Sequence, residues 1–175
     1  MHKSTNGITA SVSLMYMKTG RMTLRILEFI AKRYINRMKN RNIQHSDNWA
    51  TPDWLFNELD AEFKFDFDPC PINHDMSWDG LDVEWGNSNF VNPPYSRKLK
   101  EAFIRKAFYE WDHNGKTCVI LLPVSTSTKI FHECIYSYAE IRFIKGRVNF
   151  VGYNTKGEYV TDKKPMHDSM IVIFR

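Results

Sequence analysis

The sequence predicts an α/β fold with a mostly parallel central sheet and flanking helices. Segments with strand patterns alternate with segments of helical periodicity from residue 51 to the C-terminus. This alternation is typical of a sheet whose parallel strands are joined by helices. In addition, the run 117–122 ends in five consecutive apolar residues, as expected for a strand buried on both faces of such a sheet.

Local signals place the elements in order. Thr51 and Pro52 have the residue types of a helix N-cap and of the first helical position, so we expect a helix to follow. The alternating segment Phe63–Phe67 predicts a strand that ends at Asp68. The remaining predicted elements are a strand at 89–91, a helix at 99–111, a strand at 117–122, a helix at 128–138, and strands at 141–144 and 169–174.

Composition indicates a folded protein of a reducing cytoplasm. The chain has 175 residues, of which 43% are hydrophobic and 14% aromatic, enough for one domain with a substantial core. No run approaches the roughly 20 apolar residues of a membrane span, and the start of the chain lacks the apolar core of a secretory signal. The three cysteines form no C-x-x-C pair and the histidines are scattered, so we expect neither disulfides nor a metal site.

Positive charge is concentrated in residues 1–44. This segment has nine lysines and arginines and one acidic residue, a net charge of +8. Residues 45–175 have fifteen lysines and arginines and nineteen acidic residues, a net charge of −4. Apolar residues recur at helical spacing from Met22 to Met38, between basic ones. We therefore expect a basic N-terminal extension with an amphipathic helix at 1–44 and a main domain at 45–175. The extension either contacts nucleic-acid phosphates or is a solvated helix face, and an organellar transit peptide is a third interpretation.

A motif with chemical meaning, Asn92, Pro93, Pro94 and Tyr95, directly follows the predicted strand 89–91. The Asn92 oxygen and the rigidly held Pro93 carbonyl can both accept hydrogen bonds. Two acceptors aimed at the N–H bonds of a planar amine stabilise its change toward tetrahedral geometry as it attacks a methyl donor. Tyr95 can stack on a nucleobase that has left its helix. The motif therefore favours methylation of an exocyclic base amine, and a stiff Asn-Pro-Pro turn is the alternative.

Asp68 marks the end of another predicted strand and is followed by Pro69 and Cys70. Ligands of open α/β sheets bind outside the carboxyl ends of the strands, so Asp68 and Asn92 are expected to share one edge. An acidic residue there can hold the polar groups of a cofactor. The alternative is an aspartate that only caps a turn.

Three weaker signals follow. Asp79 lies in a polar turn and either binds ribose hydroxyls or is simply solvated. The segment Leu121–Pro123 ends an apolar strand at the same expected edge and lines a pocket or packs in the core. Arg147 and Phe150 either contact phosphate and stack on a base, or belong to an ordinary hairpin with a salt bridge.

Taken together, these features resemble a known family, the phage-type DNA N6-adenine methyltransferases, which are Dam-like. The resemblance covers roughly residues 45–175. It rests on an ordered set of segments: Trp49–Pro52, Phe67–Cys70, Asp79–Leu81 followed by Trp85, Phe90–Tyr95, Leu121–Pro123, and Arg147 with Phe150. The set is much more specific than any one segment.

The resemblance implies a Rossmann-like methyltransferase fold, S-adenosylmethionine as methyl donor and double-stranded DNA as substrate, in a bacterial or phage-infected host cell. It implies that Asn92, Pro93 and Tyr95 hold the target adenine, with Pro94 completing the catalytic motif. Arg147 and Phe150 are the further substrate-binding candidates.

For the cofactor, the resemblance places Thr51 and Pro52 beside the methionine end of S-adenosylmethionine. It assigns the main cradle to Asp68, Pro69 and Cys70, and a ribose or adenine contact to Asp79. The glycine-rich loop usual after the first strand of methyltransferases is absent from this chain.

The chain has little room for a separate target-recognition domain. Sequence reading would then come from loops such as 152–168, from the basic extension, or from a second subunit, so the protein is expected to be a monomer or a homodimer.

Two other functions remain open from the sequence. The same motif serves methylation of other planar amines, namely cytosine N4, RNA adenine and protein glutamine. A non-catalytic DNA-binding relative would use the basic extension without the pocket.

Overall fold

The computed structural model describes residues 49–72, 78–153 and 158–175. All of them belong to one unit of the chain, Ile43–Arg175. The expected helix at 22–38, and the basic extension that contains it, lie outside the described residues.

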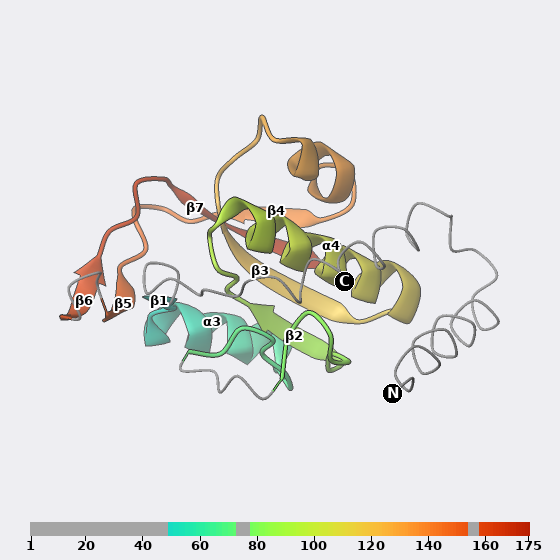
Figure 1. Cartoon of the computed structure of the whole chain (residues 1–175), viewed down its shortest axis with the longest axis horizontal. Helices are drawn as coiled ribbons and strands as arrows, with labels where there is room; N and C mark the ends of the chain where they lie inside the picture. The colour runs from blue at the N-terminus through green and yellow to red at the C-terminus, as the bar shows by residue number, and fades with distance from the viewer. Residues whose placement is uncertain (1–48, 73–77, 154–157) are drawn as a thin grey trace, which may run out of the picture. The chain divides into compact units, whose positions relative to one another are not determined.

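A four-stranded mixed sheet forms the centre of the structure (Figure 1). Its strands, in spatial order, are β2 (Ser88–Val91), β3 (Thr117–Pro123), β7 (Ser169–Phe174) and β4 (Glu140–Phe143). β2 and β3 are parallel, whereas β7 is antiparallel to both β3 and β4. The carboxyl ends of β2 and β3 therefore meet the start of β7 at one edge.

The expectation of a Rossmann-like fold with a mostly parallel sheet is wrong. Only one of the three strand pairings in this sheet is parallel, and the described residues contain three helices: α3 (Asp53–Phe63), α4 (Arg97–Asn114) and the short π-helix η2 (Phe131–Ile135). β7 is buried at all six positions, as a central parallel strand would be. Continuous burial reports that both faces are covered but carries no information on strand direction.

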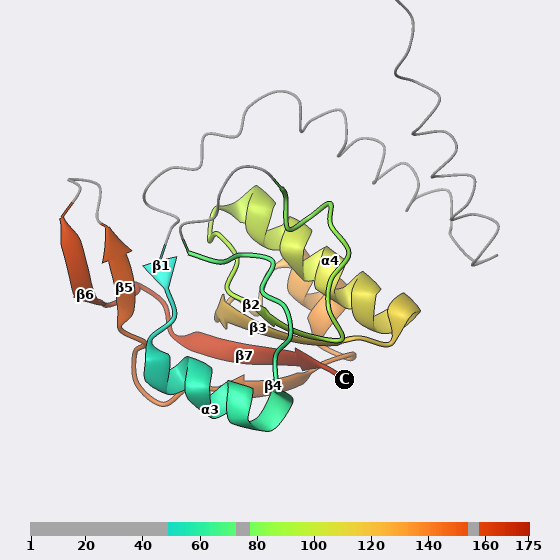
Figure 2. The same cartoon turned by 90° about the horizontal axis from the view of Figure 1, so that it is seen from below.

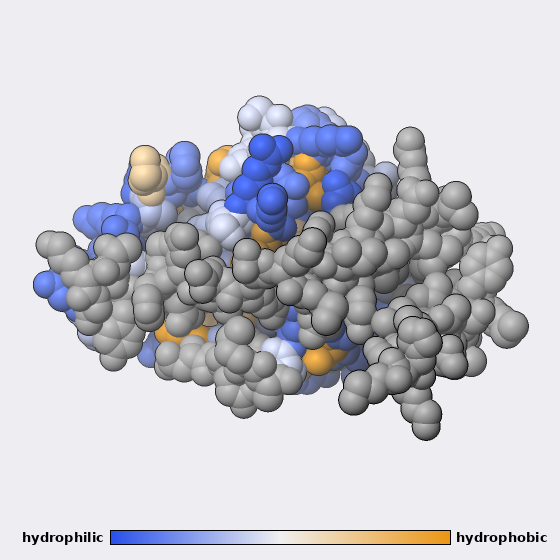
Figure 3. All heavy atoms as spheres, viewed as in Figure 1, coloured by the Kyte–Doolittle hydropathy of each residue, from blue (hydrophilic) through white to orange (hydrophobic). Residues whose placement is uncertain are grey.

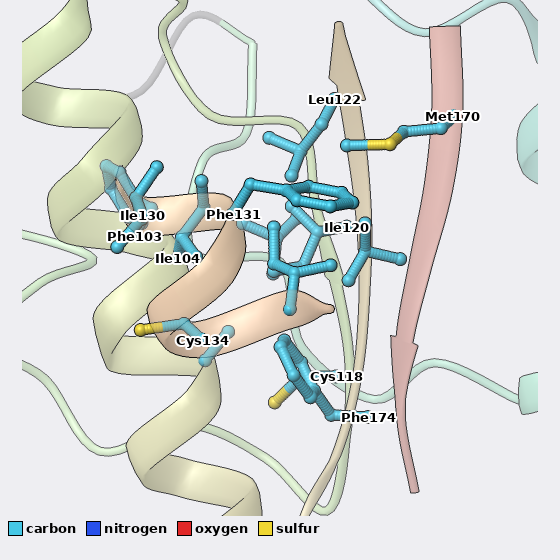
Figure 4. Packing of buried hydrophobic residues seen from close by; sticks show 14 of the residues in the cluster. Phe103, Ile104, Cys118, Ile120, Leu122, Ile130, Phe131, Cys134, Met170 and Phe174 are labelled. Carbon is cyan, nitrogen blue, oxygen red and sulfur yellow. The ribbon is translucent and has the colours of Figure 1, made fainter. Parts of the chain in front are cut away.

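The helices cover the two faces of the central sheet (Figure 2). Alternate residues of β3 and β7 point to opposite faces, so Cys118, Ile120 and Leu122 pack against α4 and η2, while Val119 and Leu121 pack against α3. Figure 4 shows the first of these clusters. Cys118 is buried, as expected from its apolar run, and all three cysteines are free.

A second, smaller sheet lies beside one end of the central sheet (Figure 1). It is antiparallel throughout, in the order β1 (Trp49–Ala50), β5 (Phe150–Tyr153) and β6 (Tyr159–Lys163). β5 and β6 belong to the long excursion between β4 and β7. This excursion reverses the chain and brings β7 back antiparallel to β4.

Two predicted elements differ in detail. α3 begins at Asp53 with Pro52 as its N-cap residue, so Thr51 does not cap it. The predicted strand Phe63–Phe67 shrinks to one parallel bridge between Phe67 and Asn89, because α3 extends to Phe63 and Lys64 then takes a left-handed conformation with φ of 52°. Phenylalanines at 63 and 65 suit the end of an amphipathic helix as well as a strand.

Helix α4 shows how the sequence sets an element. Phe103, Ile104 and Ala107 are buried at helical spacing, and the helix stops where Gly115 adopts a φ of 65°. The predicted helix 128–138 is present mainly as η2 and the turns around it. Among the described residues, no helix has both the length and the apolar character needed to cross a membrane.

Candidate active site

The Asn-Pro-Pro-Tyr motif begins one residue after the end of β2. Pro93 is buried, and the Asn92 side chain is held in place by one hydrogen bond: its Nδ2 donates to the Trp49 carbonyl at 2.8 Å. Trp49 is itself fixed, because β1 pairs with β5. This bond uses one of the two amide N–H groups and fixes the orientation of the side chain, whose Oδ1 is the acceptor that it can offer to a ligand.

Asn92 opens into a pocket of about 400 Å³ at the edge where β2 and β3 end and β7 begins. Two further members of the motif, Pro93 and Tyr95, line it, whereas Pro94 does not. The remaining lining residues come from strand ends, from α4 and from the segment after β6: Trp49, Lys100, Pro123, Ser125, Phe150, Lys163, Pro165, Met166, His167 and Ser169.

Two aromatic rings form one wall of this pocket. Tyr95 and Phe150 meet edge to face, with ring centroids 5.9 Å apart and an interplanar angle of 89°. Burial raises the pKa of the Tyr95 phenol, so it stays protonated at neutral pH. Its hydroxyl is buried and has no hydrogen-bond partner among the described residues. Because such a group is costly to leave unpaired, it is available to a ligand.

A second group of candidates gathers around Asp68. Phe67 pairs in parallel with Asn89, so Asp68 and Asn92 both follow the ends of neighbouring parallel segments. The Asp68 Oδ1 accepts a hydrogen bond from the Cys70 backbone N–H at 2.7 Å. This is the aspartate turn that the sequence left open as an alternative, but it occupies only part of the carboxylate's capacity to accept hydrogen bonds.

Asp79 lies beside this turn. Its neighbour Gly80 packs so closely that an added Cβ would come within 1.9 Å of the Pro69 carbonyl oxygen. The Trp85 indole donates to the Gly80 carbonyl at 2.6 Å, which fixes the backbone of the second turn at Gly80. Asp79 is buried, with its Oδ1 accepting from the Leu81 N–H at 2.9 Å, so it is not the solvated turn residue that a polar sequence suggests.

The electrostatics of this second group favour a polar ligand. Burial raises the pKa of Asp68 to about 6, against an ordinary value of 3.8. Burial, together with the Asp68 carboxyl, also raises the pKa of the Cys70 thiol. A carboxylate held in a desolvated position is stabilised by hydrogen-bond donors such as ligand hydroxyl or amino groups.

Thr51 and Pro52 connect β1 to α3. The Pro52 carbonyl accepts hydrogen bonds from the backbone N–H groups of Leu55 and Phe56 and so starts the helix. Thr51 Oγ1 is buried and has no hydrogen-bond partner within the described part of the chain. None of the six cofactor candidates lines the pocket at Asn92.

Arg147 is used within the protein. Its guanidinium donates to the Pro165 carbonyl and pairs with Asp168 at 3.8 Å, and it does not line the pocket. Sequence reasoning did not single out individual lining residues after β3 or from the end of β6 onward, among them Ser125, Lys163 and His167. For Ser125 a signal existed, since it follows the predicted strand 117–122 at the edge already assigned to Asn92. For Lys163 and His167 the signal was their place in the loop 152–168, which was expected to help read the DNA sequence. No group of three or more metal-ligating side chains gathers in residues 49–72, 78–153 and 158–175.

Comparisons with known proteins define the class of this protein as an adenine-specific DNA methyltransferase. A family model described as DNA N-6-adenine-methyltransferase (Dam) matches residues 38–175. A protein named DNA N-6-adenine-methyltransferase from Haemophilus phage HP1 (strain HP1c1) is 34% identical over 151 residues, covering 78% of this chain and 84% of the relative. No solved structure matches significantly.

The chain therefore belongs to the DNA N-6-adenine-methyltransferase (Dam) family.

Proposed function

We propose that the protein transfers the methyl group of S-adenosylmethionine to the N6 amine of an adenine in double-stranded DNA, and that the adenine enters the pocket at Asn92. Family membership supports this reaction. The observation that carries the assignment to this pocket is the hydrogen bond from Asn92 Nδ2 to the Trp49 carbonyl, which leaves the Asn92 oxygen for the target amine.

The chain's own residues act on the amine. Its nitrogen lone pair is delocalised into the adenine ring and must localise for attack. Asn92 Oδ1 and the Pro93 carbonyl oxygen accept hydrogen bonds from the two N–H groups of the adenine amine. They thereby stabilise the positive charge that develops on the amine nitrogen in the transition state. Because the Trp49 carbonyl already orients the amide, little reorganisation is needed when the base arrives.

Tyr95 supplies the aromatic surface for the base. Phe150 meets its ring edge to face and restricts its rotation. The base must leave its stack to reach such a site, and stacking on an aromatic side chain offsets part of that cost, about 1–3 kcal/mol per base.

Three features support a cofactor site at the other candidates: the buried Thr51 hydroxyl without a partner, the paired turns at Asp68 and Asp79, and the close approach of Gly80 to Pro69. Asp68 and Asp79 would bind the donor groups of the cofactor and Thr51 a polar atom at its methionine end. Bound S-adenosylmethionine supplies an electrophilic methyl group.

The test is transfer of labelled methyl groups from S-adenosylmethionine to duplex DNA by purified protein. Asn92→Ala should lower kcat by about 100-fold or more, the usual loss for removal of a preorganised dipole at a reacting centre. Asn87→Ala is the matched control, because Asn87 is exposed and bonds through its backbone, whose N–H donates to Asp66 and whose carbonyl accepts from the Thr117 N–H.

Sequencing of DNA from expressing cells for modified adenine gives the recognition site. A folded protein that binds the cofactor but labels no DNA would contradict the proposal. A parallel panel of RNA, duplexes made only of G·C pairs, and protein acceptors would then identify which other planar amine is used.

A further inference from the structure

One apolar side chain stands out at the mouth of the Asn92 pocket. Met166 is 87% exposed, more than any other exposed large hydrophobic residue in the described part of the chain, and yet it lines the pocket. The described residues on the face in Figure 3 are mainly hydrophilic, with hydrophobic colour in small separate patches. A single exposed apolar side chain is ordinary on a protein surface, but Met166 lines a ligand pocket, where it can contact whatever binds there.

The turn that carries Met166, residues 164–168, is fixed at several points. The Arg147 guanidinium donates to the Pro165 carbonyl and pairs with the Asp168 carboxylate. The Asp168 carbonyl accepts a hydrogen bond from the Val124 N–H at 2.8 Å, which ties the turn to the end of β3. Met166 is therefore presented at a defined place beside the pocket, although its side chain is exposed.

Two positively charged side chains stand at the same opening. Lys100 lines the pocket from α4 and Lys163 from the end of β6, and the His167 side chain lines it from the turn itself. The Lys163 ammonium lies 5.9 Å from the centre of the Trp49 ring, which restrains it near the pocket. Cations on several sides of an opening can contact the backbone phosphates that flank a displaced nucleotide.

We propose that Met166 is a wedge that enters the base stack of the DNA at the place the target adenine leaves. This inference rests on the proposed function. Removing an adenine from a duplex leaves an apolar gap between the neighbouring base pairs, and a side chain that fills it holds the duplex open. Methionine suits the task because its unbranched, polarisable chain adapts to the irregular space between bases. Met166 is thus a positioning residue and does not touch the reacting atoms.

The experiment uses the full-length protein and a duplex containing the methylated site found by sequencing. In one duplex, 2-aminopurine replaces the target adenine, so that its fluorescence rises when the base leaves the stack. Met166→Ala should reduce this rise and lower kcat/KM on the matched duplex by about 10- to 100-fold, the equivalent of an unstacking cost that is no longer offset. Met166→Leu should restore most of both signals.

A second duplex separates the wedge from a merely structural role. When the target adenine faces an abasic site it is already unpaired and leaves the stack at little cost. Met166→Ala and wild type should then differ by less than about 3-fold, because the wedge is no longer needed. Phe143→Ala, which removes another exposed apolar side chain that does not line the pocket, should behave as wild type on both duplexes.

The wedge would be overturned if wild-type protein methylates the matched duplex and Met166→Ala does so equally well. The same loss of kcat/KM in Met166→Ala on the abasic duplex would also contradict the proposal. Failure of wild type to methylate any duplex would instead count against the proposed function, so the two failures are distinguishable.

Discussion

Among single residues, Asp68 carries the clearest conflict between stability and function. Its folded-state pKa of about 6 lies above the ordinary value of 3.8, so the cofactor-free protein favours the protonated carboxyl. Below pH 4 the Asp68 carboxyl is protonated in both the folded and the unfolded chain, so its burial as a charge costs no folding stability. Between pH 4 and 6 the unfolded chain loses the proton first, and above pH 6 folding must retain a desolvated charge.

Asp68→Asn should therefore raise the free energy of unfolding of the cofactor-free protein at pH 7.5, by up to about 3 kcal/mol, because asparagine can keep the bond from the Cys70 N–H without the charge. The gain should vanish at pH 4. Urea unfolding at the two pH values measures it, and the exposed Asp162→Asn is the control. An equal gain at both pH values would show that the charge is not responsible.

The site residues differ in how far their positions could be predicted from the sequence. Asn92 and Tyr95 could be placed at one strand end because their motif has a chemical meaning, whereas Phe150, which lines the same pocket, was a stacking candidate without a predicted place at that strand end. Arg147 could not be assigned, since its partners Pro165 and Asp168 are about 20 residues away in sequence and only the fold brings them together. Met166 carried no pattern at all; only its exposure beside the pocket marks it.

At the level of elements, the contact between the turns at Pro69 and Gly80 leaves no room for a larger side chain in the candidate cofactor site. Gly80→Ala would place a Cβ 1.9 Å from the Pro69 carbonyl oxygen, a rigid backbone atom, so the turns must separate. We expect a loss of about 1–3 kcal/mol in the free energy of unfolding, as for overpacking. S-adenosylmethionine affinity should fall by about tenfold or more, because Asp68 and Asp79 move apart.

Titration calorimetry with S-adenosylmethionine measures that affinity. Gly115→Ala is the matched control: Gly115 has a φ of 65°, so alanine strains the backbone there, but no atom lies near the added Cβ. It should cost about 1 kcal/mol of stability and leave the cofactor affinity unchanged. Normal cofactor binding by Gly80→Ala would place the cofactor site elsewhere.

Element positions followed from local patterns, and strand directions did not. β2, β3, β4 and β7 all lie within one or two residues of their predicted bounds, because apolar runs between polar turns mark strands wherever they pair. The direction of β7 depends on how the chain returns from β6, a tertiary property without a local signal. The mixed sheet nevertheless brings the ends of β2 and β3 to one edge, as the expectation about Asn92 required.

For the whole molecule, the charge distribution sets how it meets DNA. Residues 45–175 have a net charge of −4, so the part with the pocket does not attract DNA by net charge, although Lys100, Lys163 and His167 line the opening. We therefore expect long-range attraction to come mainly from the nine basic residues of segment 1–44. If that segment is a phosphate-contacting arm rather than a solvated helix face, it supplies affinity without contributing to the chemical step.

Replacing Arg33, Arg37 and Arg41 together by alanine should therefore weaken DNA binding most at low salt. The slope of log affinity against log salt should become less steep by up to about 3, because each phosphate contact contributes about 0.9. At saturating DNA, kcat should stay within about twofold, since the pocket is unchanged. The control replaces the exposed Arg97, Lys98 and Lys129, which changes the net charge of the protein equally. Equal slopes for both triple variants would mean that only net charge matters. An unchanged slope for the first variant would favour the solvated-face interpretation, so one salt series decides between the alternatives that the sequence alone left open.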